Sequence, residues 1–115
     1  PPLLRPRDIR SFAAERDWEK FQTPRNLLLA LVGEVGEAAE IFQWKGEVDA
    51  DLTQFTDEEK HHLGEELSDV LFYLLRLADV CKIDLGKAAL LKLVKNKEKY
   101  PVGKCLGKST KYNKL

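Results

Sequence analysis

Two pairs of acidic residues in this chain could support metal-dependent chemistry. The pairs are Glu34-x-x-Glu37 and Glu66-x-x-Asp69. Residues three apart lie on one face of a helix, and each pair interrupts an apolar helical pattern, where unpaired carboxylates are costly to bury. If the two helices pack together, the carboxylates converge, and two of them ~6 Å apart at an effective dielectric constant of ~20 repel by roughly 3 kcal/mol. A divalent cation between them would relieve this repulsion.

A site built only from carboxylate oxygens favours Mg²⁺, for which Mn²⁺ can substitute, over iron or zinc. Di-iron carboxylate bundles use Glu-x-x-His, and neither pair has a histidine at that position. His61 and His62 precede the second pair by about one turn and are expected on the surface. Mg²⁺ commonly completes its shell with water and substrate phosphates, so the pairs indicate a phosphate ester or phosphoanhydride substrate. The alternative is an ordinary solvated acidic face.

Two aromatic residues are candidates for contacting the rest of such a substrate. Trp18 and Trp44 could stack on a base, although ordinary packing accounts for most tryptophans. Tyr73 follows Asp69 by four residues, so the two share the helix strip that also carries Glu66.

The elements that position these residues are expected to be helices, because apolar residues recur at spacings of three and four. The expected helices cover about 7–15, 24–45, 56–82 and 84–99, with Thr23 and Thr56 as N-caps. Residues 102–115 are expected to be extended or mobile. We therefore expect an all-α domain over 1–100 and a basic C-terminal tail over 101–115.

The third of these helices is apolar around much of its circumference, which predicts an oligomer. Val70, Leu71, Phe72 and Leu74 fall on several of its faces. A helix exposed to water on one side needs only one apolar face, and a domain of 115 residues has little other surface to cover the rest. We expect a dimer or a larger assembly.

Composition argues against a binding partner that is a nucleic acid or a membrane. The net charge is zero and the pI is about 7.2, whereas proteins that bind long polyanions are usually basic. From Lys92 to Leu115, however, eight lysines face one acid, so this tail could meet phosphate, although a solvated basic tail explains it equally well. Asn96 and the nearby Lys92 could reach phosphate or sugar, but for the lysine a solvated surface is the better explanation from the pattern alone. No apolar stretch has membrane-spanning length and no signal peptide is evident. Two unpatterned cysteines fit a protein of the reducing cytoplasm or nucleus, and a cytoplasmic location is expected first.

Several longer segments resemble the all-α, MazG-like nucleoside triphosphate pyrophosphohydrolases, in particular the eukaryotic-type members that act on dCTP. Together they cover most of the chain. The similar segments are Phe12–Trp18, Pro24–Trp44, Glu65–Tyr73, Asn96–Pro101 and Ser109–Tyr112.

The resemblance implies a four-helix-bundle-like protomer that assembles as a dimer or a dimer of dimers. It implies Mg²⁺-dependent hydrolysis of deoxynucleoside triphosphates, with dCTP and 5-modified dCTP preferred, to the monophosphate and pyrophosphate. It also implies roles for individual residues. Glu34, Glu37, Glu66 and Asp69 would hold Mg²⁺ and form the catalytic centre, Trp18 and Trp44 would wall the base pocket, Tyr73 and Asn96 would contact the nucleotide, and Lys92 would meet its phosphates.

One position departs from the family pattern. Close relatives can place a histidine near the base on the first helix, and this chain has Ile9 there. Since an apolar side chain donates no hydrogen bond, we expect weakened selection for cytosine and measurable competition from dTTP or dUTP. The alternative function is a non-catalytic helical module that binds a nucleotide or a protein through the same acidic groove.

Overall fold

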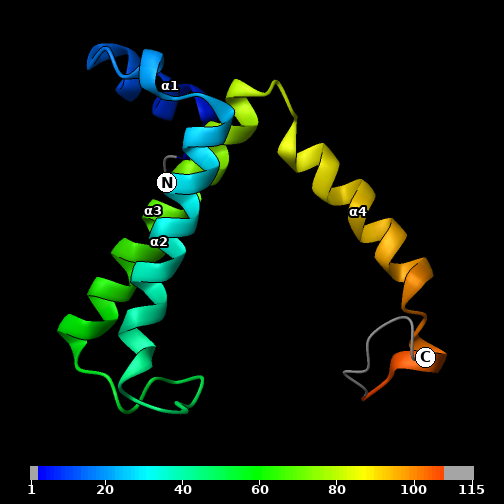
Figure 1. The fold of residues 1–115 in the computed structure, drawn as a ribbon. Coiled ribbons are helices and arrows are strands. Elements are labelled where there is room, and N and C mark those ends of the chain that lie inside the picture. Colours follow the sequence, from blue (N-terminus) through cyan, green and yellow to red (C-terminus); the bar gives the residue numbers. More distant parts are fainter. Residues whose placement is uncertain (1–2, 108–115) are drawn as a thin grey trace. The chain divides into compact units, whose positions relative to one another are not determined.

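Residues 3–107, the part of the chain that this computed structural model describes, fold into helices and connecting loops and form no strand. The elements in order are α1 (Pro6–Glu15), the 3-10 turn η1 (Glu19–Phe21), α2 (Pro24–Gln43), α3 (Asp57–Val80), α4 (Leu85–Lys99) and α5 (Val102–Cys105) (Figure 1). The chain divides into two compact units, one ending at Lys82 and the other beginning at Ile83. The prediction of an all-α protein is confirmed.

The helix starts follow from their capping residues. Thr23 Oγ1 accepts a hydrogen bond of 3.2 Å from the Asn26 N–H, and Pro24 occupies the first turn of α2. Thr56 and Glu59 form a reciprocal capping box with bonds of 3.1 and 2.9 Å at the start of α3. Both N-caps expected from the sequence are therefore confirmed, and the helix ends fall within two residues of those expected.

Helices α2 and α3 run side by side in opposite directions and form the body of the first unit (Figure 1). The loop between them is fixed to the hairpin by Phe55, whose buried ring lies 5.5 Å from that of Phe42. Lys45 Nζ also lies 2.8 Å from a Glu59 carboxylate oxygen. The loop therefore fixes how α2 and α3 align.

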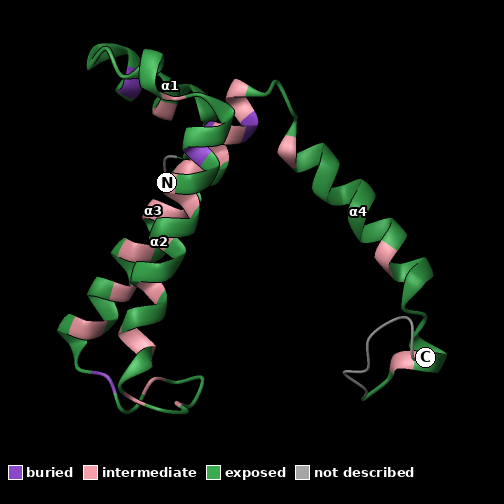
Figure 2. Cartoon of the chain, in the orientation of Figure 1, coloured by how far each residue is buried: buried purple, intermediate pink, exposed green. Residues whose placement is uncertain are grey.

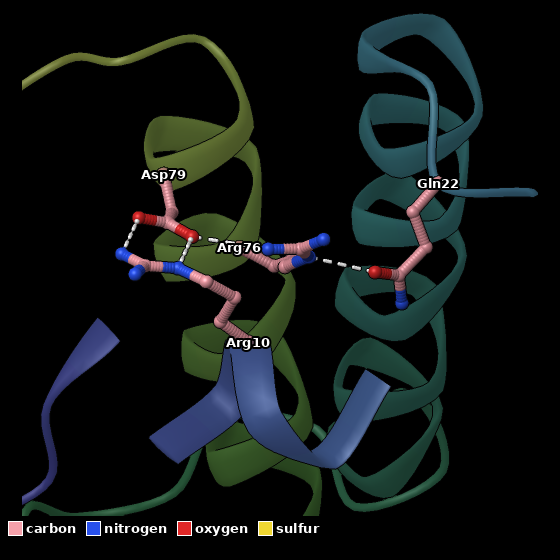
Figure 3. Close-up of polar contacts among 4 residues, drawn as sticks. All are labelled: Arg10, Gln22, Arg76 and Asp79. Atoms are coloured by element: carbon pink, nitrogen blue, oxygen red, sulfur yellow. Dashed lines mark hydrogen bonds and ion pairs between the residues drawn. The ribbon is translucent and has the colours of Figure 1, made fainter. Parts of the chain in front are cut away.

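Helix α1 is attached to α3 through a cluster of charged and amide side chains (Figure 3). Arg10 donates to both carboxylate oxygens of Asp79, at 2.9 and 2.7 Å. The buried Arg76 donates to Asp79 at 3.0 Å and to Gln22 Oε1 at 2.6 Å. The Asp79 carboxylate thus joins Arg10 and Arg76, and Arg76 extends the cluster to Gln22 in the segment that precedes α2.

Most of the described residues are exposed (Figure 2), and many large apolar side chains are among them. Val32 on α2 is 62% exposed and Leu67 on α3 is 54% exposed, and the fully buried apolar residues of the described chain are few. None of the helices within residues 3–107 has the length and apolar character needed to span a membrane.

The expectation of an extended segment after residue 101 is wrong for Val102–Cys105, which form the single turn α5. The cause is local, because the carbonyl of Pro101 accepts from the N–H groups of both Lys104 and Cys105 at 3.0 Å. Residues 108–115 lie outside the described part of the chain, and the domain boundary at residue 100 stays a prediction.

We expect Asp79→Asn to lower the free energy of unfolding by about 2 kcal/mol at neutral pH, because it removes charged hydrogen bonds and leaves Arg76 buried without its anion. The hydrogen bonds from Arg10 and the nearby arginine charges lower the pKa of Asp79. This contribution is therefore present above the ordinary aspartate pKa and is lost as pH falls through the lowered one. Urea unfolding at several pH values measures it.

The matched control is Asp17→Asn, which removes an exposed ion pair with Lys20. Exposed pairs contribute little, so the control should change stability far less. Equal losses in the two variants would show that the cluster around Asp79 does not hold α1 in place.

Candidate active site

Antiparallel packing of α2 and α3 brings acidic side chains of both helices together. Carboxylate oxygens of Glu34, Glu37 and Glu66 all lie within 4.8 Å of one another. Glu34 and Glu66 are half-buried and Glu37 is exposed. Asp69, one turn after Glu66, is close enough for its charge to act on Glu34. The convergence expected from the sequence is therefore present for Glu34, Glu37 and Glu66, and Asp69 lies beside this group.

The inner carboxylate oxygens of the cluster have no partners within the described residues. Glu34 Oε2 and Glu66 Oε2 are buried and accept no hydrogen bond. Desolvation is the main cause that raises the pKa of Glu34, followed by the charges of Glu37 and Asp69. Desolvation also raises the pKa of Glu66, with a further contribution from Glu37. The cluster therefore holds more negative charge than its own surroundings stabilise.

His62 contacts the acidic cluster. Its Nε2 lies 3.1 Å from Glu66 Oε1, and this contact opposes the rise in the Glu66 pKa. The histidine is exposed, as expected, but its contact with the cluster was not anticipated. The i, i+4 spacing of His62 and Glu66 was the available signal.

The donor set fits a hard divalent cation. Opposite oxygen ligands of Mg²⁺ are about 4 Å apart, at metal–oxygen distances of about 2.0–2.1 Å, so oxygens within 4.8 Å of one another need only a small adjustment to share one ion. A cation would also satisfy the two buried oxygens that lack partners. Glu34, Glu37 and Glu66 are thus the residues that could hold a metal, with Asp69 beside them.

A cavity of about 450 Å³ extends from the carboxylates along α3 toward α1. Its walls are mainly apolar and aromatic, and the rings of Phe12 and Trp18 meet edge to face at 5.6 Å. The lining residues are Leu4, Asp8, Ile9, Phe12, Trp18, Gln22, Glu34, Asp69, Phe72, Tyr73 and Arg76. An aromatic cavity that ends at carboxylates can hold an organic group next to a metal-bound phosphate.

The structure does not bring all predicted site residues together. Trp18 and Tyr73 line this cavity, whereas Trp44 is 85% exposed and lines a second pocket with Glu37 and Glu66. Lys92 and Asn96 lie on α4, in the unit that begins at Ile83, so their roles stay predictions.

Gln22 and Arg76 were not anticipated as lining residues. Arg76 follows Asp69 by seven residues, which is two helical turns on the same face, and that spacing was the signal. Gln22 precedes the N-cap of α2 and has no sequence pattern of its own. Its place in the cavity depends on Arg76, 54 residues later in the chain.

Comparison with known proteins identifies related sequences. The MazG-like family model matches residues 30–115. The dCTP pyrophosphatase 1 proteins of Rattus norvegicus and Homo sapiens are each 53% identical over 104 residues, which is 90% of this chain and 61% of each relative. The chain thus spans about three fifths of the length of these curated relatives.

A solved structure extends the comparison to the fold. The crystal structure of a pyrophosphatase from Archaeoglobus fulgidus has a TM-score of 0.73 and 40% sequence identity, covering 81% of this chain and 85% of that chain. Since the family model matches most of the chain and the solved structure agrees in both sequence and fold, the chain belongs to the MazG-like family.

Proposed function

We propose that this protein hydrolyses deoxynucleoside triphosphates to the monophosphate and pyrophosphate, with dCTP and 5-modified dCTP preferred, and so controls nucleotide pools. The observation that carries the proposal is the cluster of Glu34, Glu37 and Glu66, with its unsatisfied buried oxygens, at the end of an aromatic cavity. The relatives named dCTP pyrophosphatase 1 support the choice of substrate.

Mg²⁺ is the proposed cofactor, with Mn²⁺ able to substitute; when bound, it would neutralise triphosphate charge and support attack by water. Glu34, Glu37, Glu66 and Asp69 are its proposed ligands and catalytic residues. A carboxylate of this group with a raised pKa is also suited to accept the proton of the attacking water. Trp18 and Tyr73 line the cavity beside these carboxylates, and their proposed role is to hold the nucleoside against its aromatic walls.

The second candidate function is a non-catalytic module that binds a nucleotide or a protein in the same groove. The buried oxygens of Glu34 and Glu66 favour the enzyme, because binding alone does not require unsatisfied carboxylates inside the groove. Raised carboxylate pKa values are likewise typical of catalytic sites.

We also propose that the protein is a homo-oligomer, with a tetramer as the expected form. The support is the exposed apolar surface on both long helices, together with the 85% exposed Trp44 next to the carboxylates. Large exposed apolar surfaces are typical of protein interfaces. Static light scattering at micromolar concentration should show an assembly of dimer mass or more, and a monomer would contradict the proposal.

Glu34→Gln should raise the melting temperature of the metal-free protein by roughly 4 °C at pH 8, because it removes a poorly solvated charge from the cluster. A carboxylate with a raised pKa holds its proton longer in the folded state, so wild-type stability should fall as pH rises from the ordinary glutamate value through the raised one. This fall should be smaller in the variant.

Added Mg²⁺ should stabilise the wild type more than Glu34→Gln, because a ligand of the native state raises stability by mass action. The control is Glu47→Gln, which makes the same chemical change at an exposed loop position. If Mg²⁺ stabilised all three proteins equally, the cluster would not be the metal site.

Pyrophosphate release should be Mg²⁺-dependent, led by dCTP among the five nucleotides dCTP, dTTP, dUTP, dATP and dGTP, and abolished by EDTA. Alanine at Glu37, Glu66 or Asp69 should lower turnover by at least about a hundredfold, with helical circular dichroism retained and Glu47→Ala as control. Unfolding of all three variants would instead assign the cluster a structural role. No release from any nucleotide would leave the binding module as the remaining function.

A further inference from the structure

At the end of the cavity farthest from the acidic cluster, hydrogen bonds hold the polar side chains in fixed orientations. Arg76 is only 7% exposed, and its guanidinium is held between Asp79 and Gln22 (Figure 3). Both Arg76 and Gln22 line the cavity. Asp8 also lines the cavity, and it accepts the Arg5 N–H at 2.9 Å at the start of α1.

The contact with Arg76 fixes the orientation of the Gln22 amide. A guanidinium has only donors, so the group that faces Arg76 Nε at 2.6 Å must be the amide oxygen. The amide nitrogen therefore points away from Arg76, and no hydrogen bond from it to another described residue is present (Figure 3). Gln22 offers the cavity a donor, and the ion pair between Arg76 and Asp79 prevents the amide from turning over.

The position of this donor suits the base of a nucleotide. Asp69 and Arg76 are seven residues apart on one face of α3, a rise of about 10 Å, so the carboxylates and Gln22 lie at opposite ends of the cavity. A nucleotide with its phosphates at the carboxylates extends its base toward Gln22. Trp18 and Tyr73 line both this cavity and an adjoining pocket of about 310 Å³ that also includes Gln22, so the donor lies beside the aromatic rings.

We propose that Gln22, oriented by Arg76, determines base specificity by donating a hydrogen bond from Nε2 to N3 of cytosine. This inference rests on the proposed function and deepens it. Cytosine presents an unprotonated N3 acceptor, whereas thymine and uracil present an N3–H donor at the same position. Two donors facing each other lose a hydrogen bond and bury unpaired groups, so the fixed amide selects cytosine and rejects the other two pyrimidines.

The test is Gln22→Glu, which keeps the shape of the side chain and its contact with Arg76 but replaces the donor with an acceptor. The ratio of kcat/KM for dCTP to that for dUTP should fall by about tenfold or more, since one well-placed hydrogen bond gives discrimination of that order. The matched control is Gln43→Glu at the exposed end of α2, outside all three described pockets, and it should leave the ratio unchanged.

A modified substrate isolates the proposed hydrogen bond. The triphosphate of 3-deaza-2′-deoxycytidine carries C–H in place of N3, so wild-type kcat/KM should fall by about tenfold relative to dCTP, whereas Gln22→Glu should show little or no fall. Non-additivity between the protein and substrate changes is the signature of direct contact. Equal falls in both proteins would overturn the inference.

Binding of dCMP and dUMP in EDTA, measured by calorimetry, separates this inference from the proposed function. Preference of the wild type for dCMP, lost in Gln22→Glu, would support the role of Gln22 even if no triphosphate were hydrolysed. Hydrolysis of dCTP with an unchanged dCTP-to-dUTP ratio in Gln22→Glu would overturn the role of Gln22 and leave the proposed function standing.

Discussion

The burial of carboxylates between α2 and α3 is the constraint on which the rest of the site depends. Glu34 and Glu66 each hold an oxygen away from water without a hydrogen-bond donor, which opposes folding. The hairpin must therefore be held together by other contacts, and the aromatic contact of Phe42 with Phe55 and the ion pair of Lys45 with Glu59 provide them at the loop end. The folded protein already holds these carboxylates close together, so a cation that binds them does not have to bring them together. This preorganisation would increase the affinity for the cation.

The opposite charge at the far end of the cavity complements this cluster. Arg10 and Arg76 share one carboxylate, Asp79, so the group carries a net positive charge between α1 and α3. The cavity therefore runs from an anionic end, through aromatic walls, to an end that offers hydrogen-bond donors. Such a gradient orients an elongated ligand, since phosphates with a cation fit one end and a neutral base with acceptor atoms fits the other.

How much could be predicted depended on whether the determining contacts were local. The N-caps Thr23 and Thr56 were predicted because each bonds a residue three positions away, and the carboxylate pairs because their helix face follows from spacing. The contact of Gln22 with Arg76 is not local, so neither residue could be assigned to the cavity from its own surroundings in the sequence. Trp18 and Trp44 were expected in one base pocket from the family resemblance, whereas within this single chain they line two different pockets.

The non-local contact between Gln22 and Arg76 also changes the interpretation of Ile9. Weak selection for cytosine was expected because this one position lacks a hydrogen-bond donor, which assumes that a single residue reads the base. Ile9 does line the cavity, but so do Gln22 and the guanidinium of Arg76, which α3 holds in a fixed orientation through Asp79. A donor fixed by an ion pair loses little conformational freedom when a ligand binds. On the proposed role of Gln22, an apolar residue at position 9 can shape the pocket while Gln22 reads the base.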